Sequence, residues 1–122
     1  MRRRITFVGI PCFIIAACFS DHVTSAGNDD DINALCGANP GPNVVQIRNL
    51  SFQPAQLNVT PGTRVTWANC DEDIHSSTSD INVWDSGSLS PRTAYSRTMD
   101  AAGTFAYHCE PHPFMTASVR VQ

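Results

Sequence analysis

The chain has 122 residues, of which 42% are hydrophobic and 16% are charged, and its formal net charge is -3 at pH 7. This length accommodates one small domain and excludes a second domain of ordinary size. The charge balance disfavours nucleic acid as a partner, because phosphate binding requires clustered Lys and Arg, whereas eight basic residues stand against eleven acidic ones here.

The N-terminus has the pattern of an export signal. Three Arg at positions 2 to 4 precede an uncharged apolar run over residues 5–19. That run falls short of the ~20 residues that a helix needs to cross a bilayer, so we expect a signal rather than a membrane span. The mature protein is therefore expected to be exported to the periplasm.

Two processing routes are compatible with this segment. The small residues 24–26 predict cleavage after Ala26, which would remove residues 1–26. Alternatively, residues 15–18 resemble a bacterial lipoprotein motif, in which residues 1–17 are the signal and Cys18 becomes a lipidated N-terminus, the only contact with the membrane. Removing residues 1–26 takes away three Arg and one Asp and changes the net charge from -3 to -5.

The next segment, residues 27–42, is rich in Gly, Asn, Asp and Pro, which is typical of a polar linker, and we place the folded domain at residues 43–122. Three cysteines follow the signal region: Cys36, Cys70 and Cys109. In an oxidising compartment, a disulfide between Cys36 and Cys70 is the economical pairing, and it would fix the far end of the linker. The alternative is that both are buried free thiols.

From residue 44 onward, short β-rich segments alternate with turn residues, and no stretch keeps a helical period over three turns. We therefore predict an all-β fold with strands at residues 44–47, 56–59, 64–67, 93–99, 103–108 and 116–121. Turns are expected at residues 60–63 and 85–88, and this spacing is typical of a β-sandwich. The candidate core is small and contains the aromatic residues Phe52, Trp67, Trp84, Phe105 and Tyr107.

A loop between the last two predicted strands carries the clearest chemistry. Cys109, His112 and Met115 offer a thiolate, an imidazole and a thioether at intervals of three residues. A second imidazole has to come from elsewhere, and His75 is the only credible donor. Of the other two His, His22 lies in the signal or tether. His108 adjoins Cys109 on a strand, where its side chain should point to the opposite face.

This mixture of ligands predicts the metal. Two imidazoles, one thiolate and a weak axial thioether match poorly with hard ions and well with copper that cycles between two oxidation states. We therefore predict one type 1 copper ion, bound by His75, Cys109, His112 and Met115.

Several short motifs occur together and in a fixed order: Pro61-Gly62, Val65-Thr66-Trp67, His75, Asp85-Ser86-Gly87, Ala102-Gly103-Thr104-Phe105 and Tyr107-His108-Cys109-Glu110-Pro111-His112-Pro113-Phe114-Met115. In this set, residues 44–122 resemble the cupredoxins, or blue copper proteins, and most closely the branch of amicyanin, pseudoazurin and plastocyanin. The resemblance implies an eight-stranded Greek-key β-sandwich. It also implies equatorial copper ligation by His75, Cys109 and His112, with a long axial contact from Met115.

The sequence departs from the family pattern at two positions. The first ligand His is usually followed by Asn, whose side chain braces the Cys loop, whereas this chain has Ser76. Because Ser is shorter, the hydrogen bonding around the thiolate is left open. The other departure is Cys70, which the pattern does not require. We expect residues 71–73, which are all acidic, to form a solvated loop face; the alternative is that they contact a partner.

The resemblance implies an electron carrier rather than an enzyme, with single electrons leaving through the exposed edge of His112. Pro111, Pro113 and Phe114 either surround this edge as an apolar docking patch or only stiffen the loop. The expected protein is a monomer whose partner is a c-type cytochrome or a redox enzyme.

Two other function classes fit the sequence less well. A copper carrier would be richer in Met than the mature chain, which keeps only Met99 and Met115. A zinc hydrolase is disfavoured because a thioether is a poor zinc ligand, and a Cys-His nucleophile lacks room for an oxyanion pocket in this short loop.

Overall fold

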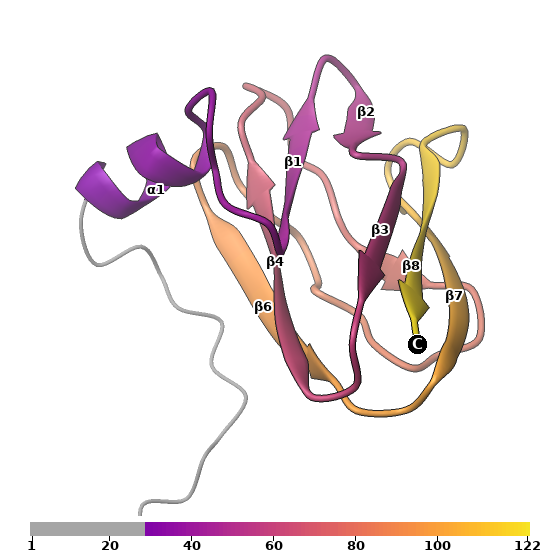
Figure 1. The fold of residues 1–122 in the computed structure, drawn as a ribbon. Helices are drawn as coiled ribbons and strands as arrows, with labels where there is room; N and C mark the ends of the chain where they lie inside the picture. The colour runs from indigo at the N-terminus through magenta and orange to yellow at the C-terminus, as the bar shows by residue number, and fades with distance from the viewer. Residues whose placement is uncertain (1–28) are drawn as a thin grey trace, which may run out of the picture.

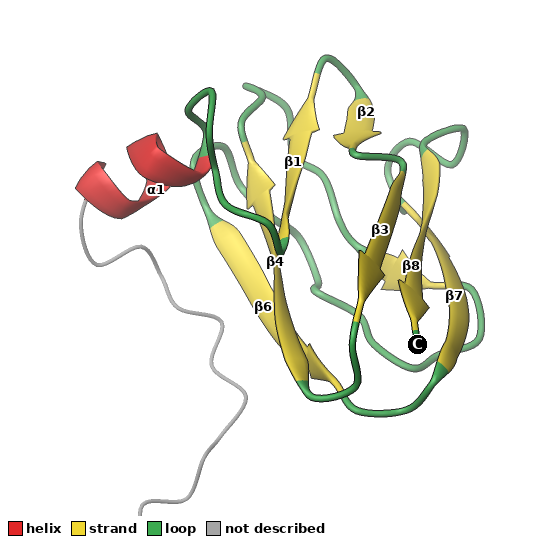
Figure 2. Ribbon diagram, viewed as in Figure 1, coloured by secondary structure: helices red, strands yellow, loops and turns green. Residues whose placement is uncertain are grey.

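The computed structural model describes residues 29–122, so both processing routes and Cys18 lie outside the described residues. The described chain forms two four-stranded sheets that enclose the core, with one short helix at the side (Figure 1). Within residues 29–122, we find no helix that is long and apolar enough to cross a membrane. The predicted all-β, eight-stranded sandwich is confirmed, and Figure 2 shows how strands dominate it.

Both sheets mix antiparallel and parallel pairs. The first has the order β2-β1-β4-β6 and consists of β1 (Val44–Arg48), β2 (Ser51–Gln53), β4 (Thr63–Asn69) and β6 (Ala94–Met99). The second has the order β3-β8-β7-β5 and consists of β3 (Gln56–Val59), β5 (Thr78–Ser79), β7 (Gly103–His108) and β8 (Thr116–Val121). The parallel pairs are β1 with β4 and β3 with β8. They join strands that are distant in sequence, so the chain repeatedly crosses from one sheet to the other.

The core lies where the inward faces of the sheets meet. On β1, Val45 and Ile47 are fully buried while their neighbours are half-buried, which is the period of two expected for a strand with one covered face. Trp67 from the first sheet and Tyr107 from the second contact edge to face, with ring centroids 5.7 Å apart. Four of the five predicted core aromatics are buried, and Phe105 packs against them half-buried.

The predicted polar linker differs from the structure. Residues 29–35 form a helix, α1 (Asp29–Leu35), which docks on the sandwich with Ile32 only 2% exposed. Side chains of the domain hold the end of the helix, since Gln46 Nε2 donates to the carbonyls of Leu35 and Gly37 at 2.7 Å. A helix of seven residues is too short to show a helical period in the sequence, and its polar composition resembles that of a linker.

The disulfide between Cys36 and Cys70 is confirmed, with an S–S distance of 2.01 Å. It joins the residue after α1 to the residue after β4. The guanidinium of Arg48 also donates to the carbonyl of Cys36, and the guanidinium of Arg92 donates to the side chain of Asn33. The segment before β1 is thereby fastened to the end of the sandwich where β1 and β4 terminate (Figure 1).

Candidate metal centre

Two loops bring the predicted ligands together. His75 lies in the loop after β4, where its backbone forms a bridge to Leu89. The N–H of His75 donates to the carbonyl of Leu89 at 3.1 Å, and the N–H of Leu89 donates to the carbonyl of His75 at 2.8 Å. Cys109 directly follows β7, and its Sγ lies 3.6 Å from Nδ1 of His75 and 3.7 Å from Nδ1 of His112. The three ligand atoms all lie within 4.8 Å of one another, so a single metal ion can reach each of them.

The loop after β7 is closed by its own backbone. The N–H of Cys109 donates to the carbonyl of Met115 at 3.1 Å, and the N–H of Met115 donates to the carbonyl of His112 at 2.9 Å. These bonds hold Met115 beside the cysteine, and its side chain is buried at 2% exposure. The axial role of the Met115 sulfur stays a prediction.

The centre is closed to solvent except along one ring. His75 and Cys109 are fully buried, whereas His112 is half-buried. Phe114 is 69% exposed, and its ring centroid lies 6.0 Å from that of His112. His112 is therefore the ligand through which the site reaches the surface.

Ser76 makes hydrogen bonds to the Cys loop although its side chain is short. Its N–H donates to the Cys109 sulfur at 3.4 Å, and its hydroxyl accepts the N–H of Glu110 at 2.9 Å. The same hydroxyl lies 2.9 Å from the hydroxyl of Thr78. Ser76 thus reaches the Cys loop despite its length, through one hydrogen bond to the Cys109 sulfur and one to the backbone of Glu110.

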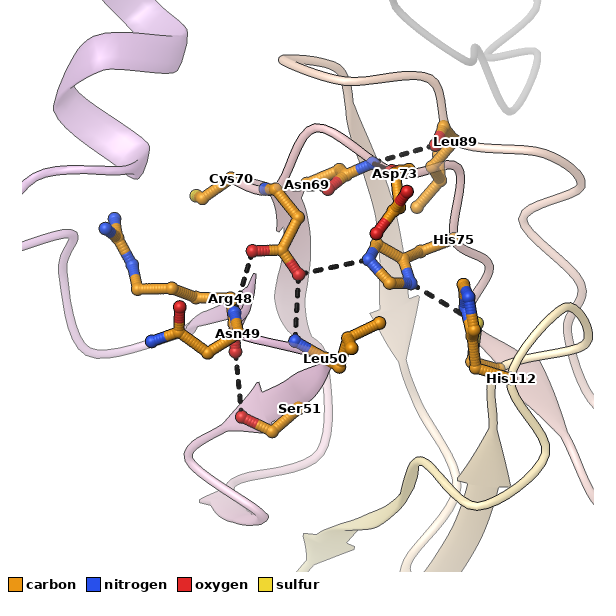
Figure 3. Close-up of polar contacts among 12 residues, drawn as sticks. Arg48, Asn49, Leu50, Ser51, Asn69, Cys70, Asp73, His75, Leu89 and His112 are labelled. Carbon is orange, nitrogen blue, oxygen red and sulfur yellow. Dashed lines mark hydrogen bonds and ion pairs between the residues drawn. The ribbon is translucent and has the colours of Figure 1, made fainter.

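The expectation of a solvated loop face is wrong for Asp71. Its side chain is only 15% exposed, and its Oδ2 lies 3.1 Å from Nε2 of His75, whose ring is labelled in Figure 3. Burial raises the pKa of Asp71, but hydrogen bonds from the N–H groups of Leu50 and Asn49 and from His75 outweigh this effect and hold the pKa below its ordinary value. An acidic run gives no sign of which carboxylate folds inward, so no sequence signal singled out this residue.

His108 lies outside the centre, as expected for its position on the opposite face of β7. Its Nδ1 is 2.6 Å from Asp80, and its Nε2 is 3.0 Å from Glu110. The hydrogen bond to Asp80, and then that to Glu110, raise the pKa of His108 above its ordinary value, against a smaller effect of burial. His22 lies outside the described residues.

The donor set fits copper. A thiolate and two imidazole nitrogens, arranged around one point and largely buried, are soft and borderline ligands that suit copper far better than magnesium or calcium. A two-sheet β-sandwich that holds such a set at one end defines a copper protein of the blue type.

Comparison with known proteins gives the family. The model of the copper binding proteins of the plastocyanin/azurin family matches residues 41–122, which is 82 of the 122 residues, and the chain belongs to this family. Amicyanin of Paracoccus denitrificans is 36% identical over 87 residues, which cover 67% of this chain and 66% of that protein. Plastocyanin of Scenedesmus fuscus is 30% identical over 93 residues, which cover 67% of this chain and 88% of that protein.

Solved structures agree with these relatives. A Cu(I) structure of an amicyanin variant superposes with a TM-score of 0.62 at 33% identity, covering 65% of this chain and 80% of that one. An oxidized structure of another amicyanin variant gives a TM-score of 0.63 at 33% identity, with coverage of 67% and 83%. The cupredoxin fold and a copper site built from His75, Cys109 and His112 are thus shown for this chain.

Proposed function

We propose that this protein is an exported carrier of single electrons. Its copper ion would be held by His75, Cys109, His112 and Met115. The observation that carries the proposal is the cluster of three ligand atoms within 4.8 Å of one another, of which only His112 comes from a side chain that is not fully buried. When bound, copper supplies the one-electron step between Cu(I) and Cu(II).

The residues of the chain hold the site in shape. The backbone bridge to Leu89 fixes His75, and the two bonds that close the loop fix Cys109 and Met115. Burial keeps water away from the thiolate. Because all of these contacts are made by protein groups alone, few atoms have to move when the charge of the centre changes.

Electrons are expected to leave through His112. This ring is the half-buried ligand, and the exposed ring of Phe114 stands beside it with Pro111 and Pro113 in the same loop. A small apolar face of this kind supports brief contacts, which bury less than about 1,200 Å² in redox pairs. Such contacts allow a monomeric carrier to exchange partners quickly.

The partner is proposed to be a basic redox protein, either a c-type cytochrome or a redox enzyme. The support is the charge of -5 that the chain carries without residues 1–26. Attraction between opposite charges would speed association, and added salt would slow it as the screening length falls to about 10 Å at 0.1 M. Stopped-flow oxidation of the reduced protein by a basic cytochrome c, repeated over a range of salt concentrations, measures this effect.

Export to the periplasm is proposed from the basic and apolar N-terminus, and the disulfide supports an oxidising compartment. The intact mass of the mature protein distinguishes the two routes. A chain that begins at Gly27 indicates ordinary cleavage, whereas a lipid on Cys18 indicates a membrane-tethered carrier.

The copper centre is tested by visible absorption after one equivalent of Cu(II) is added to the purified mature protein. We expect an intense band at about 600 nm that disappears on reduction. Cys109→Ser is the matched control, because it removes the thiolate with a minimal change of shape. A parent protein that stays colourless and redox-silent with Cu(II) would refute the electron-carrier proposal.

A further inference from the structure

Both ring nitrogens of His75 have defined neighbours. Nδ1 faces the Cys109 sulfur at 3.6 Å, and Nε2 lies 3.1 Å from Oδ2 of Asp71. An imidazole that donates its Nε2–H to a carboxylate leaves the lone pair of Nδ1 free for a metal. The contact with Asp71 therefore selects the tautomer that the copper site needs.

The carboxylate of Asp71 is held by the turn between β1 and β2. The N–H of Asn49 donates to Oδ1 at 2.7 Å, and the N–H of Leu50 donates to Oδ2 at 2.9 Å (Figure 3). Both turn residues have left-handed φ values, 52° and 56°, a conformation that is uncommon for residues other than Gly. Successive N–H groups in this conformation form a concave site for an anion, which here is the side chain of Asp71.

The backbone of Asp71 is held as firmly as its side chain. Its N–H donates to Oδ1 of Asn69 at 3.0 Å, and the amide of Asn69, fully buried, donates to the carbonyls of Asp73 and Leu89. The preceding residue, Cys70, is fixed by the disulfide and by a backbone bond to Ile47. The carboxylate is therefore a built part of the site, held independently of the His75 ring.

We propose that Asp71 is a positioning residue for the copper ligand His75, and that its negative charge lowers the reduction potential of the centre. The carboxylate accepts the Nε2–H, keeps Nδ1 directed at the Cys109 sulfur and increases the electron density of the ring. A negative charge next to a ligand stabilises Cu(II) more than Cu(I), because Cu(II) carries one more positive charge. This inference rests on the proposed function of the centre.

The test compares Asp71→Asn with Glu72→Gln and Asp73→Asn. The two control positions lie in the same loop and are exposed, so each removes one nearby negative charge without a contact to His75. Each copper-loaded protein is equilibrated with a one-electron redox dye, and the ratio of Cu(I) to Cu(II) is read from the blue band. We expect Asp71→Asn to shift this ratio about tenfold toward Cu(I), equivalent to ~59 mV, and the controls to shift it much less.

A second measurement does not depend on the stability of the variant. In the Cu(I) parent protein with ¹⁵N-labelled His, NMR should show a proton on Nε2 of His75 that exchanges with solvent more slowly than the ring proton of His112. A proton found on Nδ1, or equal shifts of the redox ratio in Asp71→Asn and both controls, would overturn the inference. A parent protein without a blue band would instead overturn the proposed function, so the two failures are distinguishable.

Discussion

Loss of the disulfide between Cys36 and Cys70 should lower the free energy of unfolding by about 4 kcal/mol. The two cysteines are 34 positions apart. Closing a loop of that length removes roughly 13 cal/mol/K of entropy from the unfolded chain, which corresponds to about 4 kcal/mol at 25 °C. Undocking of α1 adds to the loss, because Ile32 would exchange its buried environment for water.

The assay is urea unfolding of the copper-free protein, followed by the fluorescence of the buried Trp67 and Trp84. Both cysteines are replaced by Ser, and parent and variant both carry Cys109→Ser so that no free thiol can exchange with the disulfide. With a slope of about 1–3 kcal/mol/M, the midpoint should fall by at least ~1 M. Reduction of the disulfide in the parent should reproduce the shift without any substitution.

A loss below about 1 kcal/mol in both comparisons would refute this reasoning. It would mean that the unfolded chain is already restricted near Cys36 and Cys70, so that the bridge removes little further entropy. Hydrogen exchange of the amides in α1 would then show whether the helix stays docked without the bridge.

Three further predictions concern the surroundings of the metal centre. Leu89→Ala should lower the free energy of unfolding in urea by about 2–5 kcal/mol, because Leu89 is 1% exposed and its truncation leaves a cavity. A loss under ~1 kcal/mol would show that neighbouring side chains fill this cavity. Ser76→Ala should cost about 1–3 kcal/mol by the same assay, since the N–H of Glu110 loses its acceptor, whereas an unchanged midpoint would mean that water replaces the hydroxyl. Because hydrogen bonds to Asp80 and Glu110 raise the pKa of His108, protonated His108 stabilises the fold below its unfolded pKa of about 6.5, and this stability is lost as pH rises through the folded value. The free energy of unfolding should therefore fall more between about pH 6 and 8 in the parent than in His108→Asn, and equal slopes would contradict the assignment.

Strand alternation and ligand chemistry made most of the molecule predictable. Six strands follow from short apolar periods between turn residues, and three of them, β3, β7 and β8, have the predicted bounds. The three ligands that meet in the structure were found from residue type and spacing, because few metals suit one thiolate with two imidazoles.

What the sequence did not predict depends on tertiary contacts. β2 and β5 are three and two residues long, too short for a period to appear, and they are strands only because β1 and β7 pair with them. The helix α1 forms where Ile32 is buried against the domain and Cys36 forms a disulfide with Cys70. Asp71 is distinguished from its acidic neighbours only by the turn at residues 49–50, which is distant in sequence.

The attachment of α1 determines where this protein can be shortened. The region shared with the family begins at residue 41, and a fragment trimmed to that point would lack Cys36. Cys70 would then be an unpaired thiol next to Asp71 and five residues from His75. The Cys70 thiols of two molecules can be oxidised to an intermolecular disulfide, with loss of two protons, by O2 or by two Cu(II) centres that are each reduced to Cu(I). A fragment that starts at Gly27 keeps the bridge, so it should yield a stable blue protein where the shorter one bleaches on standing.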